Sequence, residues 1–482
     1  MQKLSIRGKD LRLIGFPEGP VMSLAITTMQ QHYKYYSVQQ ALSMLQEVLK
    51  NPTDFLQHQH LGKIAKGLLP NDTAALHPCI KLTSQTVPIS IYGQQYIEQG
   101  ALQQMHTAAR LPVAVAGALM PDAHTGYGLP IGGVLATSNS VIPFGVGVDI
   151  GCRMCLSVFE MPPTLLKNRQ EWFTQILLQS TLFGAGQEWK QAPEHEIMDD
   201  PHFNALPLLK QLKAKAARQL GTSGSGNHFA EFGTVSITNG HALGIAPGNY
   251  LGLLTHSGSR ALGANIANYY TQVARQLRKL PQEAAHLAWL QLNEPHGQEY
   301  WMAMNLAGRY ASACHQIIHQ KMAKHLSLKP VAVVENHHNF AWKENYQGQE
   351  VIVHRKGATP AANGVLGIIP GSMTAPGYIV MGKGVQQALF SASHGAGRLM
   401  SRSKALQSIT RHALQKELDK YGVTLIGGGL DEAPFVYKDI TAIMQAQHNL
   451  VDTVGTFSPK LVRMDGTPAK VWNKKMAISD GE

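Results

Sequence analysis

Residues 37–50 carry apolar side chains at the three- and four-residue spacing that places them on one face of an α-helix. Ser37 stands just before this run, in the position of an N-cap. The pattern predicts an amphipathic helix that packs against a core. Its apolar face consists of Val38, Ala41, Leu42, Leu45, Val48 and Leu49.

The segment from about residue 110 to 160 has a different pattern, in which short apolar runs alternate with glycines. Short apolar runs bounded by glycine are typical of buried strands joined by tight turns. Binding and catalytic residues are often carried by such turns. We therefore expect chemistry to be concentrated in this segment.

The rest of the chain alternates between helical and strand-like patterns, which indicates a mixed α and β architecture with helices covering a sheet. Helices are predicted within 160–215 and over 265–279, 300–324 and 401–421, the last ending before Gly422. Strands are predicted over 331–335, 351–355 and 377–382.

No internal repeat, low-complexity tract or long Pro/Ser linker divides the sequence. One compact catalytic body over residues 1–466 is therefore expected, with a helical N-terminal part over about 1–90. Residues 467–482 lack periodicity, and we expect a C-terminal tail there.

Composition narrows the class of protein. The 482 residues are 44% hydrophobic and 15% charged, as in globular proteins, and no apolar run approaches the length needed to span a bilayer. The opening MQKLSIRGKD is charged where a signal peptide would be apolar, so a soluble cytoplasmic protein is expected. The net charge of +11 makes a polyanion such as nucleic acid a natural partner, although a dispersed basic surface would give the same value.

The four cysteines are too few and too scattered for a disulfide framework, whereas the 22 histidines supply many candidate ligands. Asp149 and Cys152 lie three residues apart at the end of an apolar run, where a turn could direct both toward one point. Cys152 and Cys155 also form a single CxxC, which leaves redox and zinc-ribbon readings open. Together with the glycine- or polar-flanked His228, His256 and His338, these residues could complete one or two metal sites, for zinc or manganese.

His394 is followed by Gly395, Ala396 and Gly397, and then by Arg398 and Arg402 at four-residue spacing. A neutral imidazole can attack phosphorus, and adjacent glycines let backbone N–H groups approach a phosphate. The alternative interpretation is a structural histidine that precedes a packing helix.

Nine sequence blocks between residues 120 and 439 occur in the order found in RtcB-type RNA ligases, and the chain resembles this family from about residue 5 to 466, nearly its whole length. They are MPDAHTGYGLPIGG, GVGVDIGC, GSGNHFAE, THSGSRALG, HHN, HRKGAT, IPGSM, SHGAGR and DEAPFVYKD. The resemblance implies a single large α+β catalytic domain with mixed sheets, glycine-rich turns and covering helices. It also implies an enzyme of tRNA splicing or RNA repair that uses GTP and two Mn²⁺ ions to join RNA 3′-phosphate or 2′,3′-cyclic phosphate ends to 5′-hydroxyl ends.

Carried over position by position, the resemblance implies that Asp149, Cys152 and His228 hold one manganese ion and that Cys152, His256 and His338 hold the other. His394 is implied as the nucleophile that forms a histidine–GMP intermediate, from which GMP passes to the RNA 3′-phosphate as an RNA-ppG end. Arg398 and Arg402 are implied to hold RNA phosphates.

The resemblance also implies a nucleotide pocket that includes metal-binding and catalytic residues. Its members would be Asn227, His228, Phe229, Ala230, Glu231, His338, Asn339, Pro370, Gly371, Ser372, Met373, His394, Gly395, Ala396 and Gly397. It leaves open whether an activating protein partner is needed.

Three positions depart from the family pattern: Arg153 follows the GVDIGC block, Gly377 replaces a serine that contacts the guanylate, and Asp465 stands near the place of a guanine-recognising lysine. A carboxylate can also accept from guanine, so nucleotide preference is open. Two alternatives to a ligase are a metal-dependent cyclic phosphodiesterase or nucleotidyltransferase that does not seal RNA, and a non-catalytic RNA-binding protein.

Overall fold

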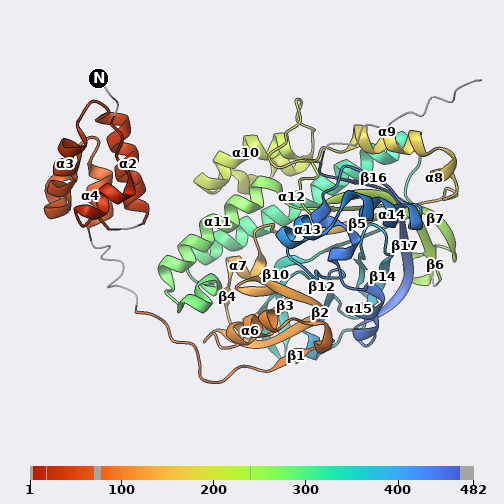
Figure 1. Ribbon diagram of the computed structural model, residues 1–482. Coiled ribbons are helices and arrows are strands. Elements are labelled where there is room, and N and C mark those ends of the chain that lie inside the picture. Colours follow the sequence, from red (N-terminus) through yellow and green to blue (C-terminus); the bar gives the residue numbers. More distant parts are fainter. Residues whose placement is uncertain (1–3, 18, 70–77, 239, 467–482) are drawn as a thin grey trace, which may run out of the picture. The chain divides into compact units, whose positions relative to one another are not determined.

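The computed structural model describes residues 4–17, 19–69, 78–238 and 240–466 (Figure 1). The chain divides into two compact units, Met1–Pro78 and Cys79–Glu482, the first of which ends inside the N-terminal part that the sequence predicts to be helical. The expected tail over 467–482 lies outside the described residues. Among helices of the described ranges, none combines the length and apolar character that crossing a membrane requires.

The first unit is helical and has its own apolar core, which includes Leu11, Phe16, Met29, Leu45 and Ile64. The helix predicted over 37–50 is confirmed, with Ser37 as its N-cap. The Ser37 hydroxyl accepts a hydrogen bond from the Gln40 amide and the Gln40 side chain accepts one from the Ser37 amide, which together form a capping box. The elements are α1 (Gly8–Leu13), α2 (Pro20–His32), α3 (Val38–Lys50), η1 (Pro52–Phe55) and α4 (Gly62–Leu68).

The second unit contains two large sheets. The smaller has the strand order β1-β2-β3-β11-β10, in which only the β1–β2 pair is parallel. Its central hairpin lies in the glycine-rich segment, where strands with tight turns were predicted. The strands are β1 (Ile89–Ile91), β2 (Ala114–Tyr127), β3 (Leu129–Thr137), β10 (Asn339–Tyr346) and β11 (Gln349–Lys356).

The larger sheet has the order β13-β14-β17-β6-β7-β5-β9, with β16 (Thr424–Ile426) paired in parallel to β17. The Asn336 side chain joins its two outer strands, because Oδ1 accepts from the Ile368 amide at 2.9 Å and Nδ2 donates to the Ile368 carbonyl at 3.3 Å. The strands are β5 (Arg153–Phe159), β6 (Phe229–Ile237), β7 (Gly248–Ser257), β9 (Ala332–His337), β13 (Leu366–Ile369), β14 (Gly377–Gly382) and β17 (Val451–Met464).

Long helices cover the sheets (Figure 1), and α12 packs on β5 and β7. The helices predicted over 265–279 and 300–324 are confirmed as α11 (Arg260–Leu277) and α12 (Pro295–Leu326), and the α+β class is confirmed. The other helices are α6 (Gln99–Ala108), α7 (Pro143–Val146), α8 (Leu165–Asn168), α9 (Gln170–Ser180), α10 (Pro207–Gln219), α13 (Arg402–Ser408), α14 (Arg411–Tyr421) and α15 (Ile440–Ala446). Short paired strands are β4 (Ser140–Val141) with β8 (Leu290–Gln291) and β12 (Ala358–Pro360) with β15 (Ser391–Ser393).

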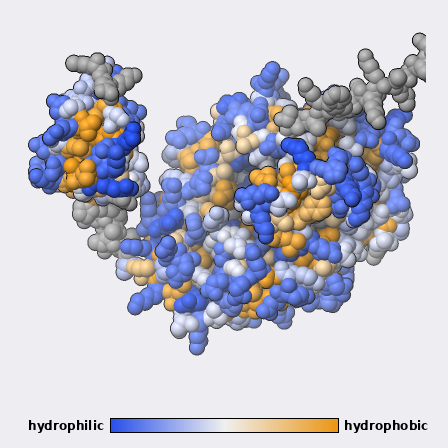
Figure 2. Space-filling view, in the orientation of Figure 1, coloured by the Kyte–Doolittle hydropathy of each residue, from blue (hydrophilic) through white to orange (hydrophobic). Residues whose placement is uncertain are grey.

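The single helix predicted over 401–421 is wrong, since two helices occupy this stretch. The Thr410 hydroxyl accepts a hydrogen bond from the Ala413 amide and so caps a new helix start, which the apolar spacing alone does not reveal. The end before Gly422 is confirmed, because this glycine takes a left-handed conformation at φ 62°. Hydrophobic residues gather beside these two helices in the face that Figure 2 shows.

Candidate active site: a thiolate-centred cluster beside a histidine

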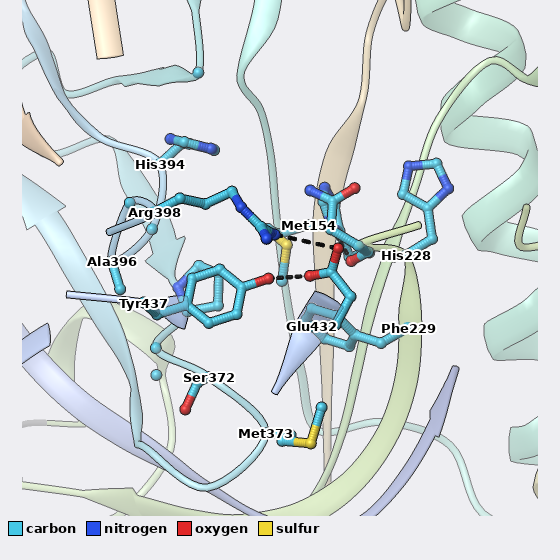
Figure 3. Close-up of a pocket in the computed structure, with 18 of the residues that line it drawn as sticks. Met154, His228, Phe229, Ser372, Met373, His394, Ala396, Arg398, Glu432 and Tyr437 are labelled. Atoms are coloured by element: carbon cyan, nitrogen blue, oxygen red, sulfur yellow. Dashed lines mark hydrogen bonds and ion pairs between the residues drawn. The ribbon is translucent and has the colours of Figure 1, made fainter. Parts of the chain in front are cut away.

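A cavity of about 420 Å³ lies in the second unit, with walls that include the large sheet and the loops after β13 and β15. All five predicted metal ligands line it, as do the predicted nucleophile His394 and the two predicted arginines. Figure 3 shows a part of this wall, in which His394 and His228 project from different segments of the chain.

Cys152 stands at the centre of the candidate metal cluster. Its Sγ lies 3.4 Å from His228 Nε2 and 3.2 Å from His256 Nε2. His256 Nε2 lies 3.2 Å from His338 Nε2, and Asp149 Oδ2 lies 3.1 Å from His228 Nε2. The sulfur therefore stands between an Asp–His pair and a His–His pair, as a ligand shared by two ions would.

Backbone carbonyls orient two of these histidines. His228 Nδ1 lies 2.8 Å from the Ser223 carbonyl, and His256 Nδ1 lies 2.9 Å from the Asn227 carbonyl. His228 Nδ1 also lies 3.2 Å from the Arg260 guanidinium, and its Nε2 faces the Asp149 carboxylate. At His256, because a carbonyl only accepts, Nδ1 carries the proton and the Nε2 lone pair faces the cluster. This is the tautomer that a metal ligand requires.

Asp149 is held by the residues just before α11. Its Oδ1 accepts from the Ser259 amide at 3.0 Å. A Cβ at Gly258 would lie 2.1 Å from the carboxylate oxygens, so only glycine fits beside it. Burial opposes ionisation of Asp149, but the hydrogen bond and charge of His228 outweigh it and lower the pKa of the carboxyl.

Except at Asp149, burial in this cluster favours neutral side chains. Burial, and then the charge of Asp149, raise the pKa of the Cys152 thiol well above its usual value. Burial and neighbouring histidines lower the pKa values of His256 and His338. His338 Nδ1 is buried and has no hydrogen-bond partner among the described residues. A divalent cation would supply the positive charge that a buried thiolate needs, so the donor set fits such ions.

His394 lies against this cluster, with its ring centroid 5.0 Å from that of His338. Its Nδ1 lies 2.7 Å from Asp122 Oδ2, and the same oxygen accepts from the His394 amide at 3.2 Å. The hydrogen bond and charge of His394 overcome the effect of burial and lower the pKa of Asp122, which is therefore ionised. An ionised carboxylate accepts the Nδ1 proton, and this leaves the Nε2 lone pair of His394 for chemistry.

The Asp122 segment is itself fixed by two contacts. Lys438 Nζ donates to the Ala123 carbonyl at 2.7 Å and to the Pro121 carbonyl at 3.3 Å, on either side of Asp122. Gly397 has φ 78°, and a Cβ there would lie 2.0 Å from the Asp122 carbonyl oxygen. A glycine is therefore required at position 397, because the chain packs closely there on Asp122, the residue that orients the His394 imidazole.

The predicted nucleotide residues line the cavity with one exception. Ala230 is fully buried in a separate apolar cluster, because its neighbours Phe229 and Glu231 face the cavity and side chains alternate along β6. Glu231 is buried among the lining residues, and burial raises the pKa of its carboxyl well above the usual value. Its carboxyl has no hydrogen-bond partner among the described residues, so it is open to a ligand.

Two acidic residues and a tyrosine, which sequence reasoning did not assign to the site, contact the arginines. The Tyr437 hydroxyl and Arg398 point toward Glu432 (Figure 3), and the Arg398 guanidinium lies 3.3 Å from its carboxylate. Arg402 forms ion pairs with both Glu432 and Asp431. The DEAPFVYKD block was the available signal for these residues, but it does not say which side chains they meet.

The three departures from the family pattern lie in different places. Arg153 points away from the cavity and pairs with Glu335 at 2.6 Å, while it also donates to the Gly308 carbonyl at 2.7 Å. Gly377 lines the cavity. Asp465 does not, although its neighbour Met464 does, and the Asp465 carbonyl accepts from the Gly428 amide at 2.9 Å.

A second group of potential ligands lies between the large sheet and α12: Cys155, His315 and His319, all buried. Here hydroxyl groups lie between the imidazoles. Thr255 Oγ1 is 2.6 Å from His315 Nδ1 and 2.8 Å from His319 Nε2. Distance alone allows either group of Cys and His residues to hold an ion.

Comparisons with known proteins give a consistent result. Residues 104–465 match the family model described as tRNA-splicing ligase RtcB. The chain is similar to RNA-splicing ligase RtcB of Escherichia coli K12, at 31% identity over 407 residues that span 78% of this chain and 97% of that protein. It is also similar to tRNA-splicing ligase RtcB of Thermococcus kodakarensis, at 30% identity over 440 residues, 75% of this chain and 91% of that protein.

Proposed function

The chain belongs to the RtcB family, and on this basis we propose that it is an RNA ligase that depends on GTP and manganese. It would join RNA 3′-phosphate or 2′,3′-cyclic phosphate ends to 5′-hydroxyl ends, in tRNA processing or RNA repair. The observation that carries the proposal is His394, whose Nδ1 is engaged by Asp122 and whose ring lies 5.0 Å from that of the candidate ligand His338.

Asp149, Cys152 and His228 would hold one manganese ion, and Cys152, His256 and His338 the other. The donor set supports two ions, because the Cys152 sulfur lies between an Asp–His and a His–His pair. The ions would neutralise charge on the phosphates and orient the leaving group.

The first step would be transfer of GMP to His394. The Nε2 lone pair attacks the α-phosphorus of GTP, an N–P bond forms, and the bond from the α-phosphorus to the bridging oxygen breaks to release pyrophosphate. The ring then carries a positive charge, which the buried Asp122 carboxylate stabilises through Nδ1–H.

The second and third steps return His394 to its starting state. A 2′,3′-cyclic phosphate end must first be opened by water, which breaks the bond from phosphorus to O2′ and leaves a 3′-phosphate and a 2′-hydroxyl. An oxygen of the RNA 3′-phosphate then attacks the phosphorus of the His394 adduct, the N–P bond breaks, and an RNA-ppG end forms. The 5′-hydroxyl of the other RNA end then attacks the 3′-phosphorus, loses its proton and displaces GMP. The joined RNA carries an ordinary phosphodiester.

The cavity supports guanylate binding through the lining residues already named. Glu231 is the carboxyl that we assign to guanine, because it lines the cavity without a protein partner whereas Asp465 does not line it. A carboxylate accepts from guanine N1–H and the 2-amino group, and these donors would favour its ionised form.

Arg398 and Arg402 would contact RNA phosphates. In the free protein both are paired with carboxylates, so RNA phosphates would compete with Glu432 and Asp431 for the guanidinium groups. The net charge of +11 supports attraction of RNA and predicts salt-sensitive binding. We assign catalysis to the unit that begins near residue 79, and expect it to act in the cytoplasm.

Covalent labelling tests the chemistry directly. Purified protein with manganese and α-labelled GTP, or α-labelled ATP in parallel, should acquire acid-labile label from GTP. His394→Ala should acquire none, while His412→Ala, at an exposed position on α14, should label like the wild type.

Sealing of defined RNA ends tests the rest of the sequence of steps. Substrates with a 3′-phosphate and with a cyclic phosphate, each paired with a 5′-hydroxyl strand, should both give joined product. A protein that binds manganese but takes no label from either nucleotide would contradict the proposal and favour the phosphodiesterase or RNA-binding alternative.

A further inference from the structure

An aromatic group lies at the edge of the site, apart from the residues assigned above. Tyr127 is 70% exposed and contacts the rings of Phe144 and His286, with centroid distances of 6.5 and 5.9 Å. Lys356 Nζ lies 4.8 Å from the centroid of the Phe144 ring. We call Tyr127, Phe144, His286 and Lys356 the rim cluster.

The Tyr127 side chain is 70% exposed, so much of its ring surface is open to solvent. Its plane makes angles of 80° with the Phe144 ring and 62° with the His286 ring, so neither ring lies flat on it. Phe144 and His286 instead pack closely on each other, with centroids 4.9 Å apart. Neither of these two rings is therefore stacked on Tyr127, and a planar ligand could stack on its exposed part.

The rim cluster is built from the same segments that carry the candidate active site. Tyr127 ends β2, three residues after His124, which lines the cavity. Lys356 Nζ donates to the Tyr127 carbonyl at 2.6 Å, and the next residue, Gly357, lies so close to His394 that a Cβ there would be 3.1 Å from the imidazole Cε1. The four rim-cluster residues do not themselves line the cavity, but Lys356 adjoins Gly357, which lines the cavity beside His394.

Of the two basic side chains near the His286 ring, only Arg275 is exposed, because Lys356 is 5% exposed and burial lowers its pKa to about 7. Burial, and then the charges of Arg275 and Lys356, lower the pKa of His286, so both cations act on this ring. Arg275 is exposed near the end of α11. An exposed aromatic ring with an exposed arginine near it is suited to single-stranded nucleic acid, in which a base stacks on the ring and a phosphate meets the guanidinium.

We propose that Tyr127 stacks on the base of an RNA nucleotide at the ligation junction. The inference rests on the proposed function, because that function requires RNA ends to reach His394. It adds a base-binding position next to the phosphate chemistry, and base stacking there would be tolerant of sequence since every base has a planar face.

A cycle that combines a protein variant with a modified RNA tests this contact. The full-length protein, without GTP, is titrated into labelled short single strands that end in a 3′-phosphate or in a 5′-hydroxyl, each with an intact or an abasic terminal nucleotide. The variants are Tyr127→Ala, Tyr127→Phe, which keeps the ring, and Tyr421→Ala as a control at another exposed tyrosine.

Tyr127→Ala should weaken binding of one of the two intact strands about 5- to 150-fold, and the abasic nucleotide should weaken wild-type binding by a similar factor. The two changes together should cost little more than either alone, and the strand that responds identifies the end that stacks. Tyr127→Phe and Tyr421→Ala should bind like the wild type.

The proposal is overturned if Tyr127→Ala binds both strands like the wild type, or if the two changes are additive. GTP labelling of the same variants separates this result from failure of the proposed function. Labelling should survive in Tyr127→Ala, since guanylylation needs no RNA base. Loss of labelling in the wild type would instead remove the ligase mechanism on which the inference rests.

Discussion

Two buried groups of Cys and His lie on opposite faces of the same strands, β5 and β7, and their chemical states differ. Cys152 and His256 face the cavity, where sulfur and nitrogen atoms meet at 3.2 Å. Cys155 faces α12, and its sulfur lies 3.9 Å from His319 Nδ1. The two cysteines are three residues apart in the chain, Cys152 just before β5 and Cys155 within it.

The second group, with the hydroxyls that it contacts, forms a complete hydrogen-bond chain. The Ser257 carbonyl lies 3.2 Å from His315 Nε2, and because a carbonyl only accepts, Nε2 carries the proton. His315 Nδ1 is then unprotonated and accepts from the Thr255 hydroxyl. The Thr255 oxygen then accepts from His319 Nε2, and His319 Nδ1, 2.7 Å from Ser157 Oγ, accepts from that hydroxyl. Every imidazole nitrogen has a partner.

The difference teaches that residue type does not by itself make a metal site. In the cavity group, carbonyls hold Nδ1 of His228 and His256, and the Nε2 atoms meet only other potential ligands. In the α12 group, both imidazole lone pairs are already occupied by hydroxyl protons. We therefore expect ions in the first group and a polar packing network in the second.

The largest expected effect comes from removing the central sulfur. Cys152→Ala should lose both ions and lower GTP labelling by more than about 100-fold, because this ligand is shared. Cys155→Ala is the matched control and should retain two ions per chain by elemental analysis. If Cys155→Ala lost an ion instead, the α12 group would be a metal site.

The second largest expected effect is a dependence of metal affinity on pH, which arises at the cavity group. Since the pKa of Cys152 is raised in the ion-free protein, binding must release the thiol proton, and affinity should rise by about tenfold per pH unit between pH 6 and 8. Calorimetric titration in buffers of different ionisation enthalpy counts the protons released. Affinity independent of pH would mean that Cys152 is not bound as thiolate.

Thr255→Val should destabilise the fold without changing metal content. It removes the hydroxyl between two buried imidazoles and leaves them partly unsatisfied, at a cost of about 1–3 kcal/mol. Chemical denaturation measures this cost, with metal content as the parallel readout. An unchanged unfolding free energy would show that the hydrogen-bond chain adds nothing to stability.

Near neutral pH, the smallest effect is a change in the pH dependence of stability. Burial lowers the pKa values of His315 and His319 to about 3. Between pH 6.5 and 3, these two histidines therefore bind more protons in the unfolded chain than in the folded protein. Stability should fall as pH drops from about 6.5 toward 3. His319→Gln should reduce that slope by at most about 1.4 kcal/mol per pH unit, as followed by denaturation at several pH values. A slope equal to the wild type would contradict a neutral buried His319.

Local signals in the sequence predicted the regular elements well. The capped helix at 38–50, the strand over 377–382 and the glycine-rich hairpin follow from spacing, capping and turn residues that lie close together in the chain. The exception over 401–421 arises because Thr410 caps a second helix within an unbroken apolar pattern.

The sequence by itself determined which residue types are available and in which motifs, including the Cys and His residues of the cavity group and His394. Only the tertiary structure decided how they meet. Asp122 and His394 lie 272 residues apart, and Thr255 and His315 lie 60 apart, so their contacts depend on strand register and helix packing. Successive side chains of a strand point to opposite faces, so Cys152, just before β5, and Cys155, three residues later, face opposite sides of the sheet. The partners on each side decide whether a lone pair is left for an ion.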